Sequence, residues 1–92
     1  MSSLTGLVFS KTALSNLSGI PPKMRSQLIK KAKALILDRH PQGSKQLKGI
    51  RSDEDEVIYR QRSGDYRILY VVRQHPTTVI VLDIGHRKDV YR

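Results

Sequence analysis

Arginine side chains cluster in the second half of this sequence, on or beside segments that alternate like β-strands. They are Arg60, Arg62, Arg67 and Arg87, within the stretches YRQRSGDYRILYVV (59–72) and TTVIVLDIGHRKDVYR (77–92). Successive side chains of a strand point to opposite faces of a sheet, so Arg60 and Arg62 share a face. Guanidinium groups that share a face repel one another unless an anion lies among them. Their planar fork matches phosphate oxygens, so this pattern indicates phosphate binding.

The same alternation predicts two faces for the last strands. On one strand Arg67 shares its face with Leu69, Val71 and Arg73. The other face carries Tyr66, Ile68, Tyr70 and Val72. On the last strand one row is Ile80, Leu82 and Ile84, and the other is Val79, Val81, Asp83 and Arg87. We therefore expect one apolar face toward a core, and an opposite face on which the four guanidiniums gather.

The elements that position these residues follow from local signals. Ser10 is a good N-cap for a short helix carrying Ala13, Leu14 and Leu17 that stops at Gly19, and Pro21 and Pro22 begin a longer helix that ends near Arg39. Strands are predicted at 7–9, 57–62, 66–73 and 78–84, turns at 63–65 and around His75-Pro76, and loops at 41–49 and 53–56. The order strand, helix, helix, strand, strand, strand predicts an α+β fold, with the helices packed on a small, mainly antiparallel sheet.

Composition limits the classes of function. The chain of 92 residues suits one domain, residues 1–92, and carries 17 basic against 8 acidic residues for a net charge of +9. This balance favours a polyanionic partner, most simply nucleic acid, although an acidic protein is also compatible. No apolar run approaches the ~20 residues of a membrane span, and no signal-peptide pattern opens the chain, so we expect a cytoplasmic protein without membrane contact. The absence of cysteine excludes disulfides and thiol chemistry.

Several segments together resemble the RelE/ParE toxin superfamily, in particular its RelE-like messenger-RNA interferases. They are the helical hairpin with the double proline, the loop GSKQLKG (43–49), GDYRILY (64–70) and GHRKDVY (85–91). The resemblance implies a RelE-like fold and the toxin of a type II toxin–antitoxin pair. It also implies an endoribonuclease that cuts messenger RNA in the ribosomal A site. The partners would be the ribosome, messenger RNA and a cognate antitoxin, in a toxin–antitoxin hetero-oligomer.

The resemblance also assigns site residues. Arg60 matches the basic residue of the strand before the turn, with Arg62 as a helper, and Arg67 matches the arginine of the YR pair. Arg87 matches the arginine after the last strand, and Tyr91 matches the tyrosine that follows it. Two departures are visible. Ile58 stands where a second basic residue is expected, and the chain ends one residue after Tyr91, so we expect a C-terminal helix to be absent or truncated.

The expected reaction uses the 2′-hydroxyl of RNA as nucleophile and needs neither metal nor cofactor. Arginines such as Arg67 and Arg87 suit charge stabilisation at the phosphate but are poor proton shuttles, because a guanidinium group does not readily release its proton. Tyr91 is the best candidate for proton transfer. His40 and His75 lack partners at metal-ligand spacing. Further RNA-binding candidates are Lys30, Lys31, Lys33, Lys45 and Lys48.

Other interpretations stay open for the same residues. Arginines at strand ends are often solvated residues that discourage strand aggregation, and helix lysines are often only a wet surface. Tyr91 could pack over the sheet edge, and His86 is expected at the rim of the core. Two alternatives to the nuclease remain. One is a ParE-like inhibitor of DNA gyrase, and the other is an inert relative kept for antitoxin binding, which only the isoleucine at 58 favours.

Overall fold

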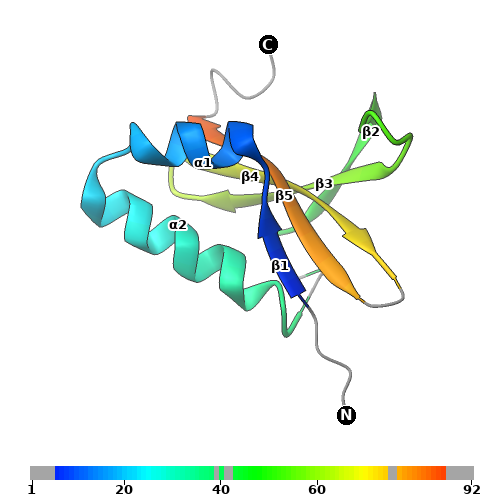
Figure 1. Cartoon of the computed structure of the whole chain (residues 1–92), viewed down its shortest axis with the longest axis horizontal. Coiled ribbons are helices and arrows are strands. Elements are labelled where there is room, and N and C mark those ends of the chain that lie inside the picture. The colour runs from blue at the N-terminus through cyan, green and yellow to red at the C-terminus, as the bar shows by residue number, and fades with distance from the viewer. Residues whose placement is uncertain (1–5, 39, 41–42, 75–76, 87–92) are drawn as a thin grey trace.

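The computed structural model describes residues 6–38, 40, 43–74 and 77–86, and it has the α+β architecture that the sequence predicts. In chain order its elements are β1 (Gly6–Phe9), α1 (Lys11–Ser18), α2 (Pro22–Ala34), β2 (Lys45–Arg51), β3 (Val57–Ser63), β4 (Tyr66–Arg73) and β5 (Thr78–His86). The five strands form one sheet in the order β1-β5-β4-β3-β2. Only β1 and β5 run parallel, and the other neighbours are antiparallel. Figure 1 shows both helices on one side of this sheet.

The two helices begin and end where their capping residues require. The Ser10 hydroxyl accepts a hydrogen bond from the Ala13 amide at 3.0 Å, and the chain leaves α1 at Gly19. Pro22 occupies the first turn of α2, where its missing N–H costs nothing. Leu14, which we expected on the apolar side of α1, is instead 54% exposed. The helix therefore contacts the sheet through a narrow stripe.

The main core lies between the helices and one face of the sheet, here called the helix-covered face. Its buried residues are Ala13, Leu17, Ile20, Leu28, Ala32, Leu35, Ile68, Tyr70, Val79, Val81 and Ile84. Tyr66 packs against this cluster and Tyr70 is part of it, so both lie on the core face as the alternation predicts, and Tyr59 packs beside them. The Tyr70 hydroxyl lies 2.8 Å from the Ser44 hydroxyl, and burial raises the pKa of the Tyr70 phenol.

The strand β2 was not predicted, because the sequence indicates a loop at residues 41–49. This edge strand exposes most of its side chains, so it has no alternation of apolar and polar residues. Its ladder with β3 shifts register between Gln46 and Arg51, and Gly49 within it has a φ of 79°, a conformation that favours glycine. An exposed, irregular edge strand gives no periodic signal.

The predicted alternation of the last strand holds for residues 79–82, but the faces assigned to its two rows are wrong, and the alternation breaks after Leu82. Val79 and Val81 are in the helix-covered core, whereas Ile80 and Leu82 belong to a second apolar cluster on the opposite face of the sheet. The pairing shifts between Leu69 and Tyr70, whose partners are Asp83 and Val81, so Leu82 is an extra residue in β5. This β-bulge reverses the alternation, and Ile84 then returns to the helix-covered core.

The face opposite the helices, here called the open face, carries this second cluster. Its buried members are Ile58, Leu69 and Val71, with Leu47, Ile80 and Leu82 packed against them. The expectation of a single apolar face is therefore wrong. Ile58 points to this face and is buried, so it packs in the position where the resemblance expects a basic side chain.

The hairpin between β3 and β4 sets the register of the site. Only Gly64 and Asp65 separate the two strands, and Gly64 has the positive φ of 60° that such short turns need. The turn predicted at His75-Pro76 lies outside the described residues. Within residues 6–38, 40, 43–74 and 77–86, neither helix has the length and apolarity to cross a bilayer.

Candidate functional site

Basic side chains meet at one end of the open face. Arg62 of β3 is the cross-strand partner of Arg67 of β4, and Arg60 is the partner of Leu69. Lys45, from the strand that the sequence analysis missed, is in turn the partner of Arg60 on its other side. Directly paired residues point to the same face, so all four cations share it. We call Lys45, Arg60, Arg62 and Arg67 the basic cluster.

The arginines of the basic cluster differ in burial. Arg67 is only 9% exposed, Arg60 is half-buried, and Arg62 is exposed. Arg67 points away from the helix-covered core, as predicted, but it is a buried residue of the open face. Its partner on β5 is Gly85, which has no side chain, so nothing projects over the open face from that position.

The geometry favours an anion at this end of the sheet. Like charges placed directly opposite one another, as at Arg62 and Arg67, destabilise a strand pair unless a counter-charge is present. Arg67 is only 9% exposed, so its guanidinium charge lies in a partly dry environment. An anion held there would be stabilised more strongly than on a fully solvated surface.

Two of the predicted site residues, Arg87 and Tyr91, lie outside the described residues. The strand that leads to them is described as far as His86. Its ring lies 5.8 Å from that of Tyr66 in an edge-to-face arrangement, on the helix-covered face. His86 is half-buried there, which agrees with the expectation of a rim position.

The lysines of α2 lie in the helical layer behind the sheet and are not part of the basic cluster. Lys30, Lys31 and Lys33 are all exposed. Lys30 and Lys31 nevertheless line a hollow of about 330 Å³ together with Ser63, the residue that follows Arg62 at the end of β3. The two basic regions thus approach the same end of β3 from opposite faces. Lys48 is exposed on β2.

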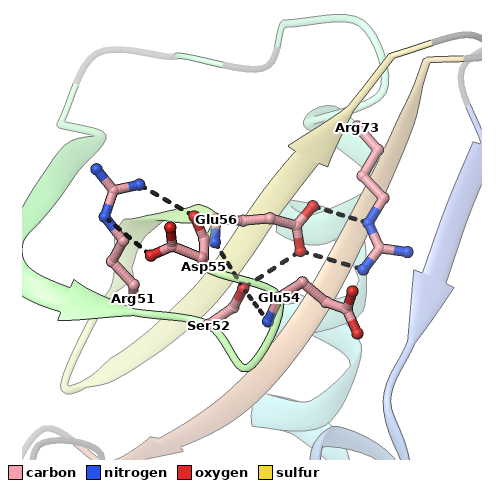
Figure 2. A network of polar contacts seen from close by, with 6 residues as sticks. All are labelled: Arg51, Ser52, Glu54, Asp55, Glu56 and Arg73. Atoms are coloured by element: carbon pink, nitrogen blue, oxygen red, sulfur yellow. Dashed lines mark hydrogen bonds and ion pairs between the residues drawn. The ribbon is translucent and has the colours of Figure 1, made fainter.

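The opposite end of the open face is organised by an acidic turn. Residues 52–56 connect β2 to β3, and Figure 2 shows Glu56 between Ser52 and Arg73. The guanidinium of Arg73 donates two hydrogen bonds to the Glu56 carboxylate, from Nε at 2.8 Å and from Nη2 at 3.1 Å. Arg73, which was predicted to share a row with Arg67, therefore forms an ion pair with Glu56.

Hydrogen bonds within the acidic turn fix the position of this carboxylate. The Ser52 hydroxyl donates to Glu56 and accepts from the Glu54 and Glu56 amides. The hydrogen bonds from Arg73 hold the pKa of Glu56 below its usual value, against the partial burial that would raise it. The same contact raises the pKa of Arg73. Of this turn, predicted as a solvated loop, only Asp53, Glu54 and Asp55 are exposed.

A groove of about 470 Å³ lies beside the acidic turn on the open face. Its lining includes the apolar side chains Ile58, Leu69 and Leu82, with residues 51–54 on one side and Ser10 and Thr12 on the other. Within the described ranges, no three His, Cys, Asp or Glu side chains gather as a metal-binding group.

The fold and this basic face define a class of small toxins, and comparison with known proteins agrees. Residues 7–91 match the family described as the ParE toxin of the type II toxin–antitoxin system, parDE. Toxin RelG of Mycobacterium tuberculosis is 33% identical over 84 residues, covering 91% of this chain and 92% of that protein. The putative toxin RelE1 of Methanocaldococcus jannaschii is 33% identical over 85 residues, covering 89% of each.

Solved structures show the same relationship. The M. tuberculosis RelBE2 toxin–antitoxin complex contains a chain that matches with a TM-score of 0.73 and 27% identity, covering 91% of this chain and 99% of that one. The isolated Escherichia coli RelE toxin matches with a TM-score of 0.70 and 26% identity, covering 94% and 89%. This chain therefore belongs to the RelE/ParE superfamily and is a toxin of a type II toxin–antitoxin system.

Proposed function

We propose that this toxin is a ribosome-dependent endoribonuclease that cleaves messenger RNA in the A site. The observation that carries the proposal is the basic cluster, in which Arg62 and Arg67 face each other across β3 and β4. Arg60 and Lys45 extend the same surface onto the neighbouring positions. Positive charges gathered on one face repel one another, and the phosphates of an RNA backbone would relieve this repulsion. The phosphates would also accept charge-assisted hydrogen bonds from the arginines.

The reaction would proceed without a metal. The 2′-hydroxyl attacks the adjacent phosphorus in line with the leaving 5′-oxygen, and one proton is removed while another is delivered. Arg67 and Arg87 would stabilise the charge that develops on the phosphate, as preorganised donors do in other enzymes. Arg60 and Arg62 would position the RNA or add positive field, and Tyr91 would transfer a proton. Lys45, Lys48, Lys30, Lys31 and Lys33 would hold remote phosphates.

The cell that makes such a toxin needs a partner that silences it. We infer a cognate antitoxin that binds residues 1–92 as a single toxin domain in a hetero-oligomer in the cytoplasm. The structures of RelBE complexes from several organisms support this partner. An acidic segment of the antitoxin over the basic cluster would block access of RNA by direct competition.

Primer extension on a defined message tests the nuclease proposal. Purified toxin is incubated with the message alone and with the same message on programmed ribosomes. We expect new 5′ ends within the A-site codon only when ribosomes are present. Cleavage of free RNA at equal rate would remove the ribosome from the proposal, and intact message in both reactions would refute the nuclease.

A second candidate, inhibition of DNA gyrase, is favoured by one specific observation. The family that matches residues 7–91 is named for the ParE toxin. In that case the basic cluster would contact gyrase or its DNA and would perform no chemistry. A supercoiling assay with purified gyrase discriminates the two functions, because a nuclease leaves supercoiling unaffected.

A further inference from the structure

The bulge in β5 determines which residues of that strand face the basic cluster. Before the bulge, Val79 and Val81 point to the helix-covered face. After it, Ile84 and His86 do so, as the partners of Ile68 and Tyr66, and Gly85 therefore lies opposite Arg67 on the open face. Without the extra residue the alternation would continue unchanged. Gly85 would then lie on the helix-covered face, and a side chain would stand across from Arg67.

Hydrogen bonds from Ser10, the N-cap residue of α1, hold the bulge in place. β1 pairs with β5 only as far as Phe9 and Val81, and the Ser10 amide then donates to the Val81 carbonyl at 2.9 Å. The Ser10 hydroxyl donates to the carbonyl of the extra residue, Leu82, at 2.7 Å. A bulge leaves a residue outside the ladder, so a donor from elsewhere is needed for its carbonyl.

A second contact holds the next residue. The Asn16 side-chain amide of α1 donates to the Asp83 carboxylate at 2.6 Å, and the same oxygen accepts the Ile84 backbone amide at 2.8 Å. Asp83 thus connects the helix to the first residue that resumes the core alternation. This hydrogen bond lies at an exposed position and fills no core volume, so packing alone does not explain it.

We propose that Asn16 and Asp83 are positioning residues that hold the β5 bulge in the register that places Gly85 across from Arg67. The inference rests on the proposed function, since the basic cluster is the site that they would align. The inference concerns no contact with RNA, and it assigns α1 a role in shaping the basic face. Misplacement of a reacting group by about 1 Å can cost on the order of a hundredfold in rate.

The first test exchanges the two partners. Asn16→Asp places two carboxylates against each other and should break the hydrogen bond between positions 16 and 83. The double variant Asn16→Asp/Asp83→Asn should restore an amide–carboxylate hydrogen bond with donor and acceptor exchanged. After Asp83→Asn, the side-chain carbonyl oxygen at position 83 can still accept from the Ile84 amide, while the NH2 group, in the place of the other carboxylate oxygen, turns toward position 16 to donate. Ser10 is unsuitable for this test, because its hydroxyl also caps α1. Ser18→Ala, which removes an exposed hydrogen bond within α1, is the matched control.

The structural readout is heteronuclear NMR of the folded proteins. We expect the cross-strand contacts between Arg67 and Gly85 to weaken in Asn16→Asp and to return in the exchanged pair. The signals of Val79 and Val81, which precede the bulge, should stay in place. Unchanged Arg67–Gly85 contacts in folded Asn16→Asp would overturn the proposal, and so would failure of the exchanged pair to restore them. If Asn16→Asp does not fold, Asn16→Ala is judged by the same criteria.

The functional readout is single-turnover cleavage of message on programmed ribosomes, beside binding of an uncleavable RNA that lacks the 2′-hydroxyl. Asn16→Asp should slow the cleavage step roughly tenfold or more while RNA affinity stays near that of the wild type. Equal loss of affinity and rate would contradict a positioning role. If the wild-type protein cleaves no RNA, the nuclease proposal fails, and the NMR exchange still decides whether Asn16 and Asp83 hold the bulge.

Discussion

The two ends of the β3–β4 hairpin carry different arrangements of charged side chains on the open face. Near the Gly64–Asp65 turn, cross-strand partners on the open face are Arg62 and Arg67, both cations. At the far end, Arg73 binds the Glu56 carboxylate through two hydrogen bonds. Between them lie Ile58, Leu69 and Val71 of the second apolar cluster. One face of one hairpin therefore passes from an ion pair, through an apolar middle, to a cluster of like charges.

This difference separates structural charge from functional charge. The ion pair stabilises the protein itself and needs no other molecule. The basic cluster instead places two cations, Arg62 and Arg67, directly opposite each other, an arrangement that binding of an anion would stabilise. Arg67 is the buried arginine of this cluster, so an anion near it would be less screened by water than one near exposed Arg62. Substitutions at the two ends should therefore affect different properties.

The largest effect is expected from Arg67. Arg67→Lys keeps the charge but removes the planar fork, and Arg67→Gln also removes the charge. We expect Arg67→Gln to slow single-turnover cleavage by roughly 10² or more, with a smaller loss in Arg67→Lys. Arg73→Gln, from the other end of the same strand, is the control and should cleave RNA at nearly the wild-type rate.

Thermal melts must accompany these rates, because Arg67 is buried. The comparison between the ends fails if folded Arg67→Gln cleaves as fast as the wild type, or if Arg73→Gln loses as much activity. Full toxicity of Arg67→Gln together with inhibition of supercoiling would transfer the assignment to gyrase.

A smaller effect is expected when Arg62 is replaced. Arg62→Gln should weaken RNA binding and flatten the slope of log affinity against log salt by roughly 0.7–0.9 for the lost phosphate contact. It should also raise the free energy of unfolding slightly, by roughly 0.2–1 kcal/mol, because it removes one of two like charges in register. A substitution that weakens binding and stabilises the fold is the signature of functional charge.

The salt dependence of RNA binding and the stability of Arg62→Gln are measured on the same preparation. Salt titrations by fluorescence anisotropy give the slope, and urea unfolding at low salt gives the stability. A lower stability of Arg62→Gln would mean that Arg62 is an ordinary structural residue of β3.

Much of the fold follows from local signals in the sequence, and the site follows only in part. Caps and prolines located both helices, and the short turn at Gly64 located the β3–β4 hairpin. Counting outward from that turn also pairs Glu56 with Arg73, so this ion pair was accessible to sequence analysis and was missed. Lys45 was selected as an RNA-binding candidate, but its place beside Arg60 required the edge strand β2.

The β5 bulge lies beyond what an alternation rule can find. A pattern of alternating residues assumes one residue per position on each strand, and an extra residue such as Leu82 reverses every face after it. The prediction placed Arg87 in one row with Val79 and Val81 by assuming alternation without a bulge. In the structure Val79 and Val81 belong to the helix-covered core. The hydrogen bond between Asn16 and Asp83 joins residues far apart in the chain, and no local sequence motif predicts such a contact.

The lysines of α2 test whether functional charge extends beyond the open face. Replacing Lys30, Lys31 and Lys33 together with Gln should weaken ribosome binding and flatten its salt slope by roughly 0.7–0.9 per lost phosphate contact. The single-turnover cleavage rate at saturating toxin should change little, because these residues lie in the helical layer. An unchanged slope would show that this helix surface is only solvated, and would confine functional charge to the basic cluster.

The smallest effect is expected at the structural end, and it depends on pH. The folded-state pKa of Glu56 lies below the ordinary value of 4.5, so its ion pair contributes stability above that pH and loses it as the pH falls through the folded-state value. Glu56→Gln should therefore lower Tm by a few degrees near neutral pH, and the difference from wild type should shrink in acid. The side chains of Arg73 and Glu56 are 48% and 23% exposed, so added salt should also reduce the difference. Asp55→Asn is the matched control, because Asp55 lies 3.6 Å from Arg51 with 89% of its side chain exposed and should contribute almost nothing. A difference between Glu56→Gln and wild type that persists at low pH would show that the carboxylate does not act through its charge. Cleavage by Glu56→Gln should match the wild type throughout, since this end of the hairpin stabilises the fold and binds no RNA.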